Sequence, residues 1–399
     1  MMQWHLRSWQ NAKLYQQPTY SEPAVLETVI DHLSDLPPLV TPAEINSLKQ
    51  QLAEAAAGKR FILQAGDCAE AFAECSAEAI NKRIKILQQM SLVLMHGYSM
   101  PVTSIGRIAG QYAKPRSELN ETIDNITLPS YRGDLINAQE FTADSRKPNP
   151  HRLIEGYGYA SMTLNYIRSL KNNALSQLKD PDSWIEPLLK NDPTAQQRLM
   201  QIGESINLLT NLQQSAISTE LFTSHEALHL LYEQALTRQH QGDWYNLSTH
   251  FPWVGIRTAK IDSAHIEYLR GIKNPIAIKV GIDMKADELL QLVNKLNPLR
   301  EVGKITLITR FGVNNISHLL PHLIKAIKNS GQPVLWSCDP MHGNTRITEN
   351  NLKTRNVEVI KQELKLAFQL HQNNRSHLGA VHLEISGDNI TECCGGICQ

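Results

Sequence analysis

The amino-acid sequence predicts a (β/α)₈ barrel, in which eight parallel strands close on themselves inside a ring of helices. From Arg60 onward, short apolar runs alternate with helical stretches, which is the pattern of parallel strands joined by crossover helices. Eight such runs can be distinguished, the number that a barrel requires. Ionisable side chains recur directly after the runs, and the active site of a barrel is built from such strand ends.

The segment before the barrel, residues 1–60, is predicted to be an N-terminal extension that carries a helix. It is polar and interrupted by prolines. Thr41 followed by Pro42 and Glu44 is typical of a helix start, and the alanine-rich stretch before Gly58 continues the helix. Residues 61–399 are assigned to the barrel.

The eight predicted strands follow in chain order. The third is the weakest prediction, because its apolar run is short and mixed. The runs are FILQAG from Phe61, PVTSIG from Pro101, TELFTS from Thr219, THFPWVG from Thr249, PIAIKVG from Pro275, KITLITR from Lys304, PVLWSC from Pro333 and AVHLEIS from Ala380.

One connection is too long for an ordinary barrel loop. About 50 residues between Leu170 and Thr219 show helical periodicity and little strand character. We interpret residues 171–218 as an inserted helical pair.

The composition excludes several classes of partner. Lys plus Arg and Asp plus Glu number 39 each, so no overall field attracts nucleic acid or an anionic membrane. The N-terminus lacks the apolar core of a secretory signal, and no run approaches the 18 or so apolar residues of a membrane span. Six cysteines in 399 residues do not make a disulfide scaffold. We therefore expect a cytoplasmic protein.

Four basic residues are expected at the carboxyl ends of the strands. They are Arg107, Arg257, Lys279 and Arg310. Four converging cations are unfavourable unless an anionic ligand neutralises them, so the pattern predicts a phosphorylated substrate. The alternative, that each belongs to a surface ion pair, stays open for any one of them.

A second anion site is predicted just beyond Arg107. The segment RIAGQYAKPRSE offers Lys114, Arg116 and Ser117 on a stretch rich in Gly and Pro, which indicates a loop whose donors hold an anion. A solvated basic loop is the alternative.

Cys68, His342 and Glu384 come from three different predicted strand ends. Thiolate, imidazole and carboxylate together suit a divalent metal such as Mn, Co, Fe or Zn. Singly, a buried Cys is usually a packing residue and a loop His usually a hydrogen-bonding one. His225 and Asp339 are read either as groups supporting the site or as structural residues that cap a strand.

These motifs resemble the class II (plant-type) 3-deoxy-D-arabino-heptulosonate 7-phosphate (DAHP) synthases. The resemblance extends from about residue 10 to Cys393. It rests on LQAGDCAEAF, RIAGQYAKPRS, LPSYRGDLIN, TSHEALHLLYE, NPIAIKVG, DPMHGNT and HLEISGDNITEC.

The resemblance implies a (β/α)₈ barrel that condenses phosphoenolpyruvate with erythrose 4-phosphate and releases phosphate, the first step of the shikimate pathway. It implies a metal that acts as a Lewis acid on the aldehyde. It also implies that Cys68, His342 and Glu384 are the metal ligands. The implied phosphoenolpyruvate site is Arg107, Trp253, Arg257, Lys279 and Arg310, with Arg107, Lys279 and His342 as the catalytic residues. The implied aldose phosphate site is Lys114, Pro115, Arg116 and Ser117.

The inserted helical pair resembles the family's regulatory insertion, which implies an aromatic amino acid as effector, and we expect a homo-oligomer. The sequence departs from the family in two places. Ile256 stands where the family's W-x-G-E-R-T motif has Glu. The chain stops 13 residues after Ser386, before the family's C-D-P-R-L-N segment, which supplies an Asp as the fourth metal ligand, and before an eighth barrel helix.

Three functions are compatible with these features. The first is an active synthase of the shikimate pathway or of a specialised pathway. The second is a catalytically impaired homologue that binds phosphate ligands or acts as a regulatory subunit. The third, an aldolase for another phosphorylated aldehyde, is disfavoured by the KPRS and DPMHGNT segments. From the short C-terminus we expect low activity, weak metal retention and a tendency to associate.

Overall fold

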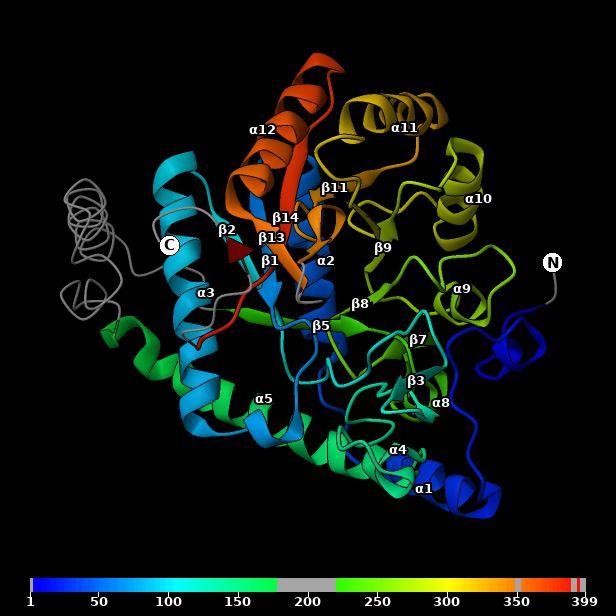
Figure 1. Ribbon diagram of the computed structural model, residues 1–399. Coiled ribbons are helices and arrows are strands. Elements are labelled where there is room, and N and C mark those ends of the chain that lie inside the picture. The colour runs from blue at the N-terminus through cyan, green and yellow to red at the C-terminus, as the bar shows by residue number, and fades with distance from the viewer. Residues whose placement is uncertain (1–2, 178–219, 349–352, 389–392, 395–399) are drawn as a thin grey trace.

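The computed structural model describes residues 3–177, 220–348, 353–388 and 393–394. Eight parallel strands form a closed barrel in the order β1-β14-β11-β10-β9-β8-β5-β2 (Figure 1). All eight predicted strands are confirmed, including the weak third one, β5, which pairs with β2 and β8. The strands are β1 (Phe61–Gly66), β2 (Val102–Arg107), β5 (Leu221–Glu226), β8 (Phe251–Val254), β9 (Ile276–Val280), β10 (Ile305–Thr309), β11 (Val334–Cys338) and β14 (Leu378–Glu384).

Helices surround the barrel, and the longest of them, α5, runs along one side of the molecule (Figure 1). No helix of the described residues has the length and apolar character needed to cross a membrane. The α-helices are α1 (Pro23–Asp35), α2 (Pro42–Ala56), α3 (Ala77–Tyr98), α4 (Ala143–Arg146), α5 (His151–Gln177), α8 (Leu230–Ala235), α9 (Ala264–Leu269), α10 (Ala286–Leu296), α11 (Ile316–Ser330) and α12 (Val357–Asn373). Short 3₁₀ turns are η1 (Ser8–Asn11), η2 (Phe72–Glu74) and η3 (His342–Asn344).

Smaller sheets lie outside the barrel. Two of them are hairpins, β3 (Asn120–Ile123) with β4 (Ile126–Pro129), and β6 (Thr237–His240) with β7 (Asp243–Asn246). A third sheet joins β12 (Arg346–Ile347), β13 (Lys353–Asn356) and β15 (Cys393–Cys394). The described residues after β14 include no helix.

The helix predicted in the N-terminal segment is α2, and it closes the amino end of the barrel. Thr41 and Glu44 form the expected capping box. Leu48, Leu52 and Ala55 are fully buried against inward-facing strand residues such as Trp253 and Leu335, among others. This segment therefore completes the barrel core.

The outer faces of β1 and β14 are covered by other parts of the same chain. Phe61, Leu63 and Val381 are each less than 5% exposed. Side chains of α3 and α12 pack over them, and the Phe61 ring stacks on those of Tyr98 and Phe368. Two flanking helices thus cover the seam between the first and last strands of the barrel. The predicted insertion, 171–218, lies almost wholly outside the described residues, apart from the last turns of α5.

Candidate active site

The carboxyl ends of the barrel strands bring the predicted site residues together. Arg107, Glu226 and Glu384 are the last residues of β2, β5 and β14. Lys279 is the penultimate residue of β9, and Arg310 directly follows β10. Because the strands are parallel, all five side chains belong to one end of the barrel.

A buried chain of ion pairs runs beneath this end. The Lys279 Nζ donates to Asp339 Oδ2 at 2.5 Å, and the same oxygen lies 2.7 Å from His342 Nδ1. Asp339 Oδ1 also accepts the backbone N–H groups of Met341 and His342. Burial works to raise the pKa of Asp339, but the charges of His342 and Lys279 hold it well below its usual range. Asp339 is therefore an anion that orients two predicted site residues.

Arg107 lies at the centre of the site. Its Nη1 donates to His382 at 2.9 Å and its Nη2 to the backbone carbonyl of Cys68 at 2.9 Å. The guanidinium carbon is 5.4 Å from the centre of the Trp253 ring, and Nη2 lies 3.5 Å from Glu384 Oε1. Its buried Nε has no partner among the described residues.

The three predicted metal ligands lie together. His342 Nε2 is 2.8 Å from Glu384 Oε1, and the Cys68 side chain hydrogen-bonds to His342. Arg355 Nη2 donates to the other Glu384 oxygen at 2.6 Å. Sulfur, nitrogen and oxygen donors from three strand ends match the ligand preferences of a borderline divalent metal.

Within the described residues, however, no cluster of three such side chains is already arranged to hold an ion. Burial works to lower the pKa of His342, but Asp339 and the neighbouring side chains raise it to about 9. His342 therefore carries a proton that a metal must displace. The donor set fits a divalent metal once His342 has lost this proton.

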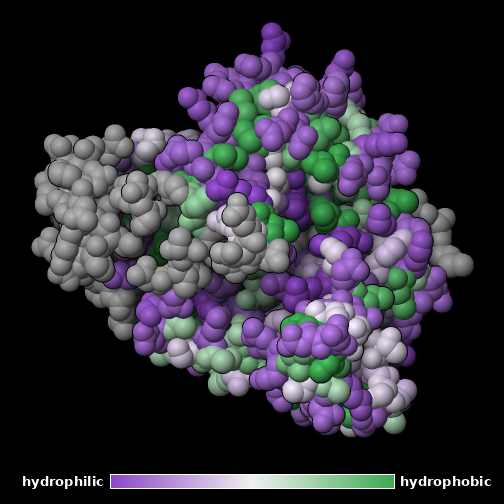
Figure 2. Space-filling view, in the orientation of Figure 1, coloured by the Kyte–Doolittle hydropathy of each residue, from purple (hydrophilic) through white to green (hydrophobic). Residues whose placement is uncertain are grey.

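A cleft of about 710 Å³ opens above these groups. Figure 2 shows hydrophilic residues around a hollow near the middle of this face. Its lining includes six residues of the site region, Arg116, Ser117, Ile256, Arg257, Arg310 and His342. Lys114 and Pro115 belong to the same loop as Arg116 without lining the cleft.

Two arginines of the cleft form no ion pair within the described residues, although nearby carboxylates such as Glu226 and Asp339 act on them electrostatically. Arg257 Nη2 donates to Ser117 Oγ at 2.6 Å, and Arg310 Nη2 donates to the backbone carbonyl of His342 at 2.9 Å. Lys279 and Arg107, deeper in the site, do lie near carboxylates. An anion that enters the cleft can therefore bind these two arginines, although the acidic residues Asp283 and Glu288 also line it.

The loop that carries Arg116 and Ser117 is held from both sides. The buried Glu70 carboxylate accepts the backbone N–H groups of Ala109, Gly110 and Gln111 at 2.9 to 3.1 Å. Ala109 has a φ of 63°, a conformation that costs a non-glycine residue energy and therefore needs such support.

On the other side, Gln16 of the N-terminal segment exchanges two hydrogen bonds with the Arg116 backbone, at 2.9 and 3.0 Å. The N-terminal segment therefore supports the predicted aldose phosphate site. Ile256, the departure from the family motif, lies in the cleft wall beside Gly281.

Glu226, the last residue of β5, is a site residue to which the sequence analysis assigned no role. Burial raises the pKa of its carboxyl group to about 7, although the charges of Lys279 and Arg257 act to lower it. Its Oε1 is buried without a hydrogen-bond partner among the described residues. Alternation along the strand shows that one of Glu226 and His225 points inward, but it does not show which one.

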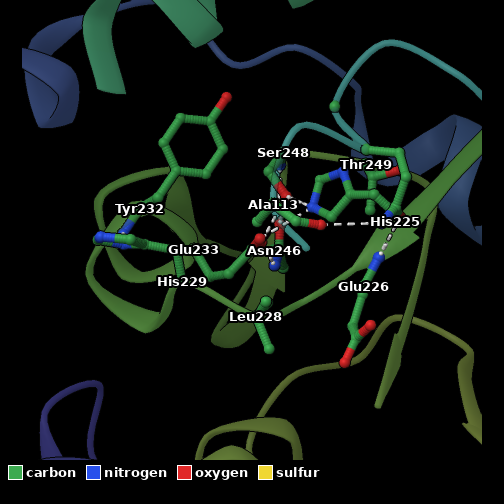
Figure 3. Close-up of polar contacts among 12 residues, drawn as sticks. Ala113, His225, Glu226, Leu228, His229, Tyr232, Glu233, Asn246, Ser248 and Thr249 are labelled. Atoms are coloured by element: carbon green, nitrogen blue, oxygen red, sulfur yellow. Dashed lines mark hydrogen bonds and ion pairs between the residues drawn. The ribbon is translucent and has the colours of Figure 1, made fainter. Parts of the chain in front are cut away.

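His225 faces away from the cleft. This supports the interpretation that it is a structural residue rather than a group supporting the site. Its Nε2 lies 2.8 Å from Glu233 Oε1, and the other Glu233 oxygen accepts from Ser248 and Asn246 at 2.6 Å. Figure 3 shows this cluster and the Glu226 carboxylate directed away from it. The cluster ties β5 to α8 and to the segment before β8.

Sequence comparisons with known proteins show the family of this chain. A family model described as the class-II DAHP synthetase family matches residues 4–399. A phospho-2-dehydro-3-deoxyheptonate aldolase of Neurospora crassa is 43% identical over 98% of this chain and 86% of its own length. The enzyme of that name from Streptomyces coelicolor is 41% identical over 98% of this chain and 88% of its own length. The phospho-2-dehydro-3-deoxyheptonate aldolase AroG of Mycolicibacterium smegmatis is 38% identical over 96% of this chain and 84% of its own length. With a match of this extent, the chain belongs to the class-II DAHP synthetase family.

Proposed function

We propose that the chain is a DAHP synthase that condenses phosphoenolpyruvate with erythrose 4-phosphate at the carboxyl end of the barrel. The observation that carries the proposal is the pair Arg257 and Arg310, which line one cleft and form no ion pair within the described residues. Phosphorylated substrates supply the missing negative charge.

The donor enol phosphate is assigned to four cations, two deep in the site and two in the lining of the cleft. Arg107, Lys279, Arg257 and Arg310 surround its phosphate and carboxylate, and Trp253 packs against Arg107. Fixed cations in a buried site stabilise anions without reorganising during the reaction. Holding both reactants in register can contribute on the order of 7 to 11 kcal/mol at best.

The aldose phosphate is assigned to Lys114, Pro115, Arg116 and Ser117. Support comes from the Arg257 to Ser117 hydrogen bond, which connects this loop to the donor site. The two phosphates then lie on either side of Arg257. The aldehyde end of the acceptor is directed toward the deeper residues.

Cys68, His342 and Glu384 are proposed to hold a divalent metal of the Mn, Co, Fe or Zn class. Bound there, the metal would polarise the aldehyde carbonyl. Asp339 orients His342 through its ring nitrogen, as carboxylates orient histidine ligands elsewhere. Glu226, with a pKa near 7, is suited to take up and return a proton at neutral pH.

Turnover tests this proposal. The purified chain with both substrates and Mn²⁺ should form DAHP and phosphate in equal amounts, and Lys279→Met should abolish both. If calorimetry shows phosphoenolpyruvate binding while no product forms with any of the four metals, the chain is a phosphate-binding homologue and the proposal is wrong. Product from another aldose phosphate alone would reassign the acceptor.

A further inference from the structure

A buried carboxylate lies behind the active site without a role in the proposed reaction. Glu363 belongs to α12, one of the two helices that cover the barrel seam, and it is only 1% exposed. A glutamate is almost never buried to this extent unless polar groups surround its carboxylate. The contacts of Glu363 therefore show what the buried charge is for.

Both carboxylate oxygens of Glu363 accept hydrogen bonds from loops that follow barrel strands. Oε1 accepts the backbone N–H of Gly312 at 3.0 Å, and Oε2 accepts a side-chain N–H of Asn344 at 2.5 Å. Burial raises the pKa of Glu363 to about 7, while the hydrogen bonds from Asn344 and Gly312 act to lower it. Above pH 7 the group is an anion that the two donors stabilise.

The two loops carry a cation of the donor site and a proposed metal ligand. Gly312 lies two residues after Arg310, in the loop that follows β10. Asn344 lies two residues after His342, in the turn that follows β11. The Asn344 Oδ1 also accepts a backbone N–H from the loop after β10, at 3.0 Å. Glu363 and Asn344 together therefore hold one loop against the other.

The backbones of these loops approach so closely that their contact requires glycine. Gly312 has a φ of 79°, and a Cβ at this position would lie 2.5 Å from the carbonyl oxygen of Gly343. The Arg310 side chain spans the same contact, because its Nη2 donates to the His342 carbonyl at 2.9 Å. With no space between them, a shift of one loop displaces the other and the site residue that it carries.

We propose that Glu363 is a positioning residue that fixes Arg310 and His342 relative to each other, and with them the phosphoenolpyruvate and metal sites. This inference rests on the proposed function, which assigns those two ligands. The aldose phosphate loop is held separately, by Glu70 and Gln16. Loss of the Glu363 carboxylate should therefore disturb donor and metal binding but not the acceptor site. A general loss of stability would not be selective in this way.

Glu363→Gln tests the proposal, because it keeps the shape of the side chain but turns an N–H₂ group toward one of the two donors. At pH 8, calorimetry should give Kd values for phosphoenolpyruvate and for Mn²⁺ that are about tenfold higher than those of the unaltered chain. With saturating Mn²⁺, the KM for erythrose 4-phosphate should stay unchanged. Glu358→Gln, at an exposed position of the same helix, is the matched control and should alter none of these constants.

Asn344→Ala removes the donor on the other side of the contact. Its effect on the Kd for phosphoenolpyruvate and that of Glu363→Gln should be less than additive in the double variant. If Glu363→Gln fails to fold, Asn344→Ala alone should raise this Kd.

Three results would overturn the proposal: unchanged Kd values for phosphoenolpyruvate and Mn²⁺ in the variants, equal shifts in all three constants, or additive effects of the two substitutions. The synthase assignment fails separately, if the unaltered chain binds phosphoenolpyruvate but forms no product. Absence of phosphoenolpyruvate binding by the unaltered chain would overturn both.

Discussion

The positions of the site cations could be predicted at the scale of single residues, because each follows a recognisable strand. Arg107, Lys279 and Arg310 lie where the sequence placed them. The sequence could not show whether Glu226 or His225 points into the site. Adjacent residues of a strand point to opposite faces, and a one-residue shift in register exchanges them. Only the pairing of β5 with β2 and β8 settles which of the two reaches the site.

Replacement of Arg310 by Ala should weaken phosphoenolpyruvate binding by about 1.5 to 3 kcal/mol, the range for a hydrogen bond to a charged group. Isothermal calorimetry measures the effect directly. Lys325→Ala removes an exposed positive charge from α11 and serves as the control. Unchanged affinity in Arg310→Ala would remove this residue from the donor site.

Glu226→Gln should lower kcat/KM by roughly a hundredfold, the lower range for loss of a group that transfers protons. The raised pKa means that the carboxyl group keeps its proton up to about pH 7, so activity that needs the ionised form falls as pH drops through 7. The variant should lose this acidic limb of the pH profile.

Glu358→Gln, on the exposed face of α12, is the control for Glu226→Gln. An unchanged acidic limb in Glu226→Gln would assign that ionisation to another group.

At the scale of elements, the sequence predicted α2 but not its place. Its start is encoded locally by Thr41 and Glu44, whose side chains cap the first turn. Its docking depends on Leu48, Leu52 and Ala55 meeting inward-facing residues from distant strands, which no local pattern records. The same holds for Gln16, which reaches Arg116 across about a hundred residues of chain.

Leu52→Ala tests the role of α2 in the barrel core. Because Leu52 is fully buried, the substitution should lower the free energy of unfolding by about 2 to 5 kcal/mol, as measured by denaturant titration. Gln50→Ala on the exposed face of the same helix should change it by no more than about 0.5 kcal/mol. Equal effects of the two variants would contradict the packing described for α2.

Glu70→Gln tests the support of the phosphate loop. The carboxylate accepts three N–H groups with two oxygens, whereas an amide presents its own N–H₂ to at least one of them. The KM for erythrose 4-phosphate should rise about tenfold, the effect of roughly 1.4 kcal/mol, while the KM for phosphoenolpyruvate stays unchanged. A uniform loss of both affinities and of stability would indicate general unfolding instead.

At the scale of the whole molecule, the eight-stranded barrel could be predicted because each strand carries its own apolar run and its own ionisable end. The packing that covers the seam between β1 and β14, where the barrel closes, could not be predicted. Phe61, Tyr98 and Phe368 come from three elements that are adjacent only after the barrel closes, so the cover over β1 and β14 has no signature in the sequence. Activity, metal retention and assembly, which we expected to be altered by the short C-terminus, stay predictions.

The central claim is that one end of the barrel holds both the metal ligands and the donor site. A crystal of the chain soaked with Mn²⁺ and phosphoenolpyruvate tests it most directly, with anomalous scattering marking the metal. We predict Mn²⁺ bonded to Cys68, His342 and Glu384, with the phosphoenolpyruvate anion against Arg257 and Arg310. Mn²⁺ bound to other residues, or phosphoenolpyruvate outside this cleft, would contradict the account.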